Sequence, residues 1–140
     1  METQEKQEVT IAPYMTKLPF TIGADQSLLK AEKLMDYLKV RHLPVLDAGK
    51  LVGILSDRDI KLVESFKDVD PDHIKVSEAY TEDPYIVSSD TPIIEVCAQM
   101  AQKKFGSVLV VDDHKLVGIF TWVDALQAME ELLKTKENLH

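Results

Sequence analysis

The sequence predicts an α/β fold of the α+β type, in which two β-α-β-β-α repeats form small sheets packed with helices. The segment Lys50–Ile54 (Lys-Leu-Val-Gly-Ile) returns at Lys115–Ile119, and this shift of 65 residues holds along the chain without a gap. Helically spaced apolar residues and short apolar runs alternate in the same order in both copies. Two long copies without a third favour two similar subdomains related by pseudo-two-fold symmetry over an open-ended solenoid.

The first predicted helix of each copy follows an acidic residue. Asp25 is the expected N-cap in the first copy, and Asp90 takes this place in the second copy, with Pro92 in the first turn. The helically spaced apolar positions are Leu28, Ala31, Leu34, Met35 and Leu38 in the first copy and Ile93, Val96, Cys97 and Met100 in the second.

Two apolar runs follow each of these helices. In the first copy they are Leu43–Leu46 and Leu51–Leu55, joined by the turn Asp47–Lys50, and in the second copy they are Val108–Val111 and Leu116–Phe120. Their near-continuous apolar character predicts strands that are covered on both faces. A second helix is expected to follow each pair of strands.

The predicted strand-to-helix junctions share the pattern Gly, two apolar residues, Ser or Thr, two variable residues, Asp. It runs from Gly53 to Asp59 in the first copy and from Gly118 to Asp124 in the second. One interpretation is structural, because Ser or Thr followed three residues later by an acid forms a capping box that starts a helix. The other is a ligand site. This interpretation is favoured because the motif occurs twice, at the same place in each β-α-β-β-α repeat.

The repeats predict the domain boundaries. We expect the first repeat to cover residues 9–66 and the second to cover 74–134, with 67–73 as a polar linker. Residues 1–8 and 135–140 are charged or polar ends that we expect to be flexible. A half of this size buries too little surface alone, so the halves are expected to pack together.

Composition excludes several classes of function. The net charge of -8 argues against nucleic acid and against anionic membranes as partners. No apolar run approaches the roughly 20 residues of a membrane span, and the amino terminus has no signal-peptide core, so we expect a cytoplasmic protein. The histidines show no ligand spacing, so no metal is expected. No nucleophile with a matching base is evident, and we expect no enzyme and no required cofactor.

Two arginines stand out in this acidic chain. Arg41 and Arg58 are the only arginines, and both lie in the first repeat beside the strand-to-helix pattern. Because a helix cap needs no arginine beside it, this placement favours recognition of one small anionic group.

Together these features resemble a tandem pair of cystathionine-β-synthase (CBS) domains, called a Bateman module. The resemblance rests on Met15-Thr16 and Pro19, on the segment Arg41–Val45, and on both Gly-x-x-Ser/Thr-x-x-Asp patterns, and it covers roughly residues 9–134. It implies a regulatory module that binds an adenosyl ligand, chiefly AMP, ADP or ATP and in some members S-adenosylmethionine. It also implies a homodimer in which the ligand changes either the shape of the dimer or its affinity for an unidentified regulated protein.

The resemblance implies two ligand sites, each built from both repeats. The first would use Lys17, Leu18, Pro19, Arg41, His42, Leu43 and Pro44 for base and phosphate, with Thr121 and Asp124 for the ribose. The second would use Pro84, Tyr85, Ile86, Gly106, Ser107 and Val108 with Ser56 and Asp59, and Arg58 would face the phosphates.

The second copy departs from the family pattern. Gly106 and Val123 stand where the first copy has Arg41 and Arg58, and Leu109 replaces Pro44. The two sites are therefore not expected to be equal. The alternative to a ligand sensor is a ligand-free dimerisation or protein-interaction module, in which both Ser/Thr-x-x-Asp patterns are only helix caps.

Overall fold

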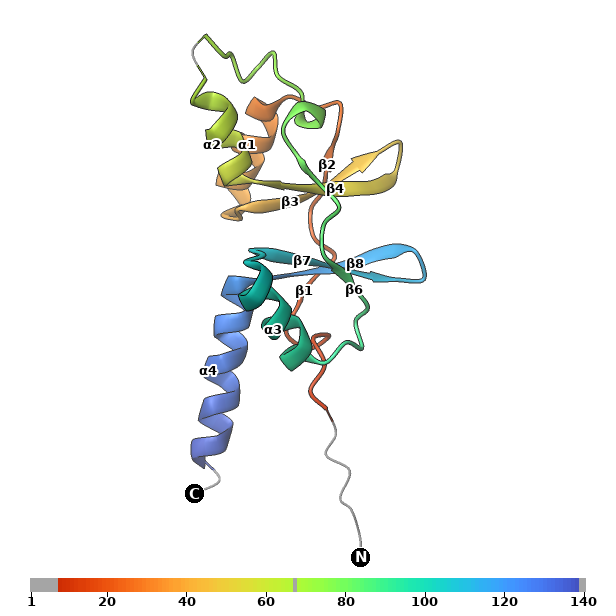
Figure 1. Cartoon of the computed structure of the whole chain (residues 1–140), viewed down its shortest axis with the longest axis vertical. Helices are drawn as coiled ribbons and strands as arrows, with labels where there is room; N and C mark the ends of the chain where they lie inside the picture. The colour runs from red at the N-terminus through yellow and green to blue at the C-terminus, as the bar shows by residue number, and fades with distance from the viewer. Residues whose placement is uncertain (1–7, 67, 139–140) are drawn as a thin grey trace, which may run out of the picture. The chain divides into compact units, whose positions relative to one another are not determined.

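The computed structural model describes residues 8–66 and 68–138, which form two compact units. Unit 1 contains the described residues up to Leu18 and from Tyr85 onward, and unit 2 contains Pro19–Pro84. Four α-helices and two four-stranded mixed sheets lie within the described part of the chain, which confirms the predicted α+β fold (Figure 1).

Unit 2 holds a sheet in the order β2-β3-β4-β5. Strand β2 is parallel to β3, and the other neighbours are antiparallel. Helices α1 and α2 lie side by side on this sheet (Figure 1). The elements in chain order are β2 (Ile22–Gly23), α1 (Leu28–Leu38), β3 (His42–Asp47), β4 (Lys50–Ser56), α2 (Asp57–Glu64), the 3-10 turn η1 (Val76–Glu78) and β5 (Thr81–Glu82).

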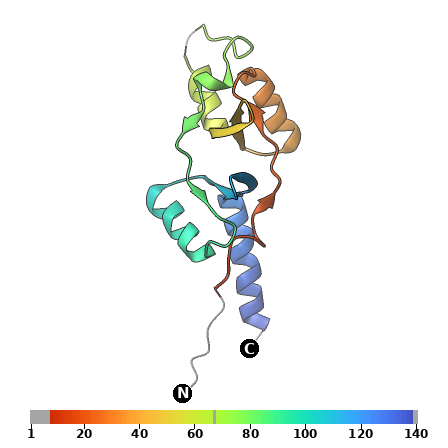
Figure 2. The ribbon, with the colours of Figure 1, turned by 90° about the vertical axis from the view of Figure 1, so that its right-hand side faces the viewer.

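Unit 1 repeats this plan in the order β1-β8-β7-β6. Helix α4 is much longer than its counterpart α2, and its second half extends beyond the sheet of its own unit (Figures 1 and 2). The elements are β1 (Thr16–Lys17), β6 (Ile86–Val87), α3 (Ile93–Lys103), β7 (Ser107–Asp112), β8 (Lys115–Thr121) and α4 (Trp122–Asn138).

One strand of each sheet is supplied by the segment that leads toward the other repeat. Strand β1 precedes the first repeated helix but pairs with β8, and β5 follows the first repeat and pairs with β4. The glycine of each motif makes room for this edge strand: a Cβ on Gly53 would collide with the Thr81 carbonyl, and one on Gly118 would collide with the Met15 sulfur. Sheet packing therefore requires glycine at position 53, where the obstructing atom is backbone, and favours it at position 118, where the obstructing atoms belong to the flexible Met15 side chain.

The predicted start of the first helix is wrong by two residues. Ser27, not Asp25, is the N-cap of α1, and its Oγ accepts from the Lys30 N–H at 3.1 Å. The preceding residues are held in a loop, because the Gln26 carbonyl accepts from the Val76 N–H at 2.8 Å. Asp90 likewise does not cap α3, whose N-cap position is Pro92.

The predicted strands and their turns are confirmed in both units. The turn after β3 places Ala48 and Gly49 at φ of 50° and 80°, and the turn after β7 places Asp113 and His114 at 49° and 66°. Two consecutive left-handed residues give the turn twist that matches a two-residue hairpin.

Each unit has its own apolar core. In unit 2 it includes Leu28, Ala31, Met35, Leu43, Val45, Leu55 and Ile60. In unit 1 it includes Ile11, Val96, Val108, Val110, Phe120 and Ala128. Burial raises the pKa of the Cys97 thiol. Among the described helices, none combines the length and apolar character needed to cross a membrane.

The expected flexible ends fall partly outside the structure. Residues 1–7 and 139–140 lie outside the described residues, as does residue 67 of the expected linker. Residues 135–138 continue α4 to Asn138. The repeat boundaries themselves stay a prediction.

Candidate functional site

Both repeated motifs form the corner at which a long strand turns into a helix. In unit 2 the corner joins β4 to α2. The Ser56 N–H donates to Asp59 Oδ2 at 2.9 Å, and the Asp59 N–H donates to Ser56 Oγ at 3.1 Å. This is a complete capping box, so the structural interpretation of the motif is correct here. It does not exclude a ligand, because the carboxylate is half-buried and keeps free acceptor capacity.

The corner of unit 1 joins β8 to α4 and is more closed. The Asp124 carboxylate accepts from the Thr121 N–H at 2.8 Å, from Thr121 Oγ1 at 3.2 Å and from Thr16 Oγ1 at 3.1 Å. Only 9% of Asp124 is exposed. The return bond from the Asp124 N–H to Thr121 Oγ1 is long, at 3.5 Å.

Two threonines complete these corners, and neither was among the predicted site residues. Thr16 on β1 bonds Asp124, and Thr81 on β5 lies 3.4 Å from both carboxylate oxygens of Asp59. The signal that could have found them is the repeat itself, since Thr16 and Thr81 are separated by the same 65 residues.

In unit 2 the start of β3 lies against the corner. His42 pairs with Ser56 in the ladder, and the Asp57 N–H donates to the Arg41 carbonyl at 2.9 Å. The segment Arg41–Pro44 therefore runs beside the N-terminus of α2. The side chains of Leu43 and Pro44 are buried, which leaves their backbone groups as the part that can meet a ligand.

The electrostatics of this corner set it apart. Arg41 and Arg58 are exposed, and within the described residues neither guanidinium forms an ion pair or a hydrogen bond. The pKa of His42 is lowered, mainly by burial and further by the charges of Arg41 and Arg58, while Asp57 and Asp59 oppose the shift. His42 is therefore neutral near pH 7, and both arginines are close enough to act on its charge.

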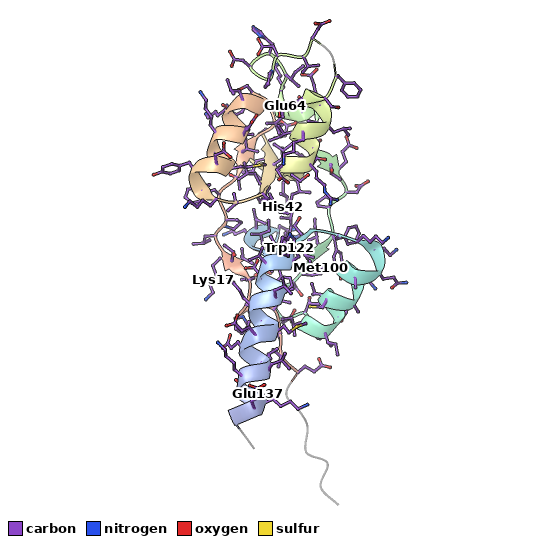
Figure 3. All side chains as sticks on the ribbon, turned by 90° about the vertical axis from the view of Figure 1, so that its left-hand side faces the viewer. Lys17, His42, Glu64, Met100, Trp122 and Glu137 are labelled. Atoms are coloured by element: carbon purple, nitrogen blue, oxygen red, sulfur yellow. The ribbon has the colours of Figure 1, made fainter. Side chains whose placement is uncertain are left out.

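The equivalent positions of unit 1 carry no cation. The Trp122 N–H donates to the Gly106 carbonyl at 3.3 Å, as Asp57 does to Arg41 in unit 2. Trp122, at the start of α4, is 47% exposed (Figure 3). The Tyr85 ring stacks on Phe105 with centroids 5.3 Å apart. The surroundings of this corner are aromatic and apolar.

The predicted site residues divide between the units as follows. Unit 2 contains Pro19, Arg41, His42, Leu43, Pro44, Ser56, Arg58 and Asp59, with Pro84 at its end. Unit 1 contains Lys17, Leu18, Tyr85, Ile86, Gly106, Ser107, Val108, Thr121 and Asp124. That each ligand site draws residues from both repeats stays a prediction. Within the described residues, no group of three His, Cys, Asp or Glu side chains is placed to hold a metal ion.

A cavity of about 450 Å³ lies between α1 and α2 of unit 2. Of the residues that line it, Arg41 belongs to the predicted site, and Glu32 and Glu64 lie close to each other there. Burial, a hydrogen bond with Glu64 and the nearby charges raise the pKa of Glu32. No feature of the sequence had indicated this cavity.

Comparisons with known proteins agree with this architecture. The family model for the CBS domain matches residues 10–64 and 76–131. Inosine-5′-monophosphate dehydrogenase of Staphylococcus epidermidis is 29% identical over 116 residues, which are 80% of this chain, and the match spans only 22% of that enzyme.

Two solved structures are similar over most of their length. The CBS domain pair of protein MJ0100, in complex with 5′-methylthioadenosine and S-adenosyl-L-methionine, has a TM-score of 0.80 and 27% identity, covering 89% of this chain and 98% of that one. CBSX2 in complex with AMP has a TM-score of 0.78 and 27% identity, covering 88% and 97%.

Proposed function

The chain belongs to the CBS domain family, and we propose that it is a regulatory module that binds an adenine nucleotide. Its ligand is AMP, ADP or ATP, and binding changes the dimer or the affinity for a partner protein. The observation that carries this proposal is the pair of unpaired arginines, Arg41 and Arg58, beside the strand-to-helix corner of unit 2. In a chain of net charge -8, exposed cations without carboxylate partners fit an anionic ligand.

The chemistry of the residues supports a phosphorylated nucleoside. A guanidinium forms bidentate bonds to phosphate oxygens, and the N-terminus of a helix favours an anion. The carboxylates of Asp59 and Asp124 are acceptors that suit the two hydroxyls of a ribose. Buried apolar strand ends offer surface and backbone groups to a base.

Within this proposal, the alternative to a nucleotide is an adenosyl ligand without phosphate, such as S-adenosylmethionine. One similar structure holds S-adenosyl-L-methionine and another holds AMP. S-adenosylmethionine has no phosphate, so it leaves the two arginines without a partner. We therefore place the nucleotide first.

A thermal-shift series tests the proposal. AMP, ADP, ATP, S-adenosylmethionine and NAD are added separately to the full chain. A nucleotide at about 100 times its dissociation constant should stabilise the fold by roughly 2.7 kcal/mol, a rise in Tm on the order of 5 to 10 °C. If none of these compounds shifts the Tm at millimolar concentration, ligand binding is contradicted. The ligand-free dimerisation or protein-interaction module is then the remaining candidate.

That interaction module is the second candidate function, and helix α4 favours it. Leu126, Met129 and Leu133 follow one face of α4 and are 53%, 56% and 53% exposed. Trp122 continues the same face toward the corner. Such a stripe of large apolar side chains is the kind of surface that helix pairing covers, and we propose that a second copy of the chain covers it.

Analytical ultracentrifugation tests the homodimer. We expect a dimer at tens of micromolar and a monomer when Leu126→Lys and Leu133→Lys are combined, because two charges would be buried in the contact. The matched control is Glu131→Lys, which changes charge at an exposed position of the same helix. A monomeric parent protein contradicts the homodimer.

A further inference from the structure

The carboxylate of Asp124 is nearly saturated by donors of its own unit. Its Oδ2 atom accepts from the Thr121 N–H at 2.8 Å and from Thr121 Oγ1 at 3.2 Å, and its Oδ1 atom accepts from Thr16 Oγ1 at 3.1 Å. An ionised carboxylate has about four acceptor positions, two on each oxygen. The position that these donors leave open is on Oδ1.

A ribose needs more acceptor positions than this carboxylate has open. When a carboxylate binds both adjacent hydroxyls of a ribose, it accepts two hydrogen bonds, so one of the present donors must leave Asp124. The Thr121 N–H belongs to the backbone where β8 turns into α4. Thr121 Oγ1 lies 3.5 Å from the Asp124 N–H, as its acceptor, so both Thr121 donors are held within the cap.

Thr16 is the donor that is free to leave. Among the described residues, its hydroxyl makes no hydrogen bond other than the one to Asp124. Thr16 lies on the two-residue strand β1 and is exposed, whereas only 9% of Asp124 is exposed. A hydroxyl at an exposed position bonds water when it loses its protein partner. An exposed side chain thus occupies an acceptor position on a buried carboxylate.

The equivalent corner of unit 2 is not closed in this way. Thr81 Oγ1 lies 3.4 Å from both carboxylate oxygens of Asp59, which is long for a hydrogen bond between oxygens. Ser56 Oγ accepts from the Asp59 N–H and takes no place on the carboxylate. Among the described residues, the short bond to the Asp59 carboxylate is the one from the Ser56 N–H, at 2.9 Å. Asp59 can therefore accept two hydroxyls and keep this bond.

We propose that the Thr16–Asp124 hydrogen bond closes the corner of unit 1 in the free protein, and that a ribose displaces the Thr16 hydroxyl in order to bind Asp124 through both of its own hydroxyls. Thr16 is then a positioning residue that lowers the affinity of this corner for a nucleotide. The inference rests on the proposed nucleotide function and adds an inhibitory contact within the binding corner.

Isothermal titration of Thr16→Ala against Thr16→Ser tests the role of the hydroxyl. Both variants lack the threonine methyl group, and they differ by one hydroxyl. One hydrogen bond corresponds to about threefold to tenfold in an equilibrium constant, so we expect Thr16→Ala to bind AMP tighter than Thr16→Ser by this factor. Thr16→Ser should bind AMP like the parent. Thr81→Ala, which removes only two long contacts, should gain less.

The ligand 2′-deoxyadenosine 5′-monophosphate gives a readout that a purely structural role of Thr16 would not move. Its sugar has one hydroxyl, which fits the open position on Oδ1 without displacing Thr16. We expect Thr16→Ala to change the affinity for this ligand by less than about twofold, so that the preference for AMP over the deoxy ligand rises. A general loosening of β1 would change both affinities by the same factor.

The unmodified chain gives a test that does not depend on the folding of a variant. Three-bond couplings measured by NMR report the χ1 rotamer of Thr16, which places its hydroxyl on Asp124 or away from it. We expect this rotamer to change when AMP saturates the chain and to stay the same with 2′-deoxyadenosine 5′-monophosphate.

The outcomes separate this inference from the proposed function. If AMP binds the parent, but Thr16→Ala and Thr16→Ser bind it equally or the Thr16 rotamer is unchanged in the complex, the inference is wrong and nucleotide binding stands. A gain in Thr81→Ala as large as the gain in Thr16→Ala overturns the assignment of the closed corner to unit 1. If AMP binds neither the parent nor these variants, the proposed function itself is contradicted.

Discussion

The two strand-to-helix corners begin with the same motif and end with different surroundings. Asp124 of unit 1 is buried and accepts from three donors on Thr121 and Thr16. Asp59 of unit 2 is half-buried and accepts one short bond from Ser56 and two long contacts from Thr81. The difference shows that a shared capping pattern can serve mainly the fold in one unit and retain acceptor capacity in the other.

The charges around the corners differ in the same sense. Arg41 and Arg58 flank the corner of unit 2, and Gly106 and Val123 stand at the matching positions of unit 1. The repeated residues build strand, turn and cap, while the residues that break the repeat change the chemistry of the surface. Any difference in ligand binding between the two units should therefore arise at the positions where the two copies carry different residues.

The largest effect should come from the paired substitutions Asp59→Asn and Asp124→Asn. If both carboxylates bind ribose hydroxyls, each change should weaken nucleotide binding by roughly 2 to 4 kcal/mol, because bonds to a charged acceptor are lost. Asp124→Asn should also lower the free energy of unfolding by about 1 to 3 kcal/mol, since its amide would leave buried donors unpaired. Asp59→Asn should cost only about 0.5 to 1 kcal/mol of stability.

Isothermal titration and urea unfolding of the same two variants separate affinity from stability. The comparison predicts a larger loss of stability for Asp124→Asn than for Asp59→Asn. If both variants bind nucleotide like the parent and merely unfold more easily, both motifs are helix caps alone.

The local elements of this fold could be predicted from the sequence because their causes are local. The hairpin turns and the caps at Ser56 and Thr121 depend on a few neighbouring residues, and the structure confirms them. The prediction that Asp25 caps α1 was wrong for a non-local reason. Backbone bonds from Val76 and Ser77 hold the loop before Ser27, which moves the start of the helix past Asp25.

The pairing of the edge strands β1 and β5 could not be derived from apolar patterns. Strands β1 and β5 have only two residues each. The partner of β1 is β8, about 100 residues later in the sequence, and the partner of β5 is β4, from which it is separated by α2 and a loop. Thr16 and Thr81 reach the motif carboxylates only because these edge strands pair with β8 and β4.

A smaller effect is expected from the cations that distinguish unit 2. Arg41→Ala and Arg58→Ala should each weaken AMP binding by about 1.5 to 3 kcal/mol and leave adenosine binding nearly unchanged, because their proposed partner is the phosphate. Lys103→Ala, at the end of α3, removes an exposed cation of unit 1 and should have little effect. Equal losses for AMP and adenosine would argue against a phosphate role.

The smallest expected effect concerns His42 and pH. In the free protein its pKa is lowered, mainly by burial, so the unfolded chain takes up the proton first as pH falls. The contribution of His42 to stability is thus present above about pH 6.5 and is lost as pH falls through 6.5 toward the lowered folded pKa. A bound phosphate would favour the imidazolium and raise this pKa again.

Affinity for AMP should therefore rise by about threefold to fivefold between pH 8 and pH 6 in the parent, relative to the variant His42→Gln. The variant serves as the reference because AMP itself gains a proton near pH 6, and this ligand titration is common to both proteins. Adenosine, which has no phosphate to hold the imidazolium, should show no such difference between the two proteins. Parallel pH profiles of AMP affinity in parent and variant would place His42 away from the phosphate and leave Arg41 and Arg58 as the groups that distinguish unit 2.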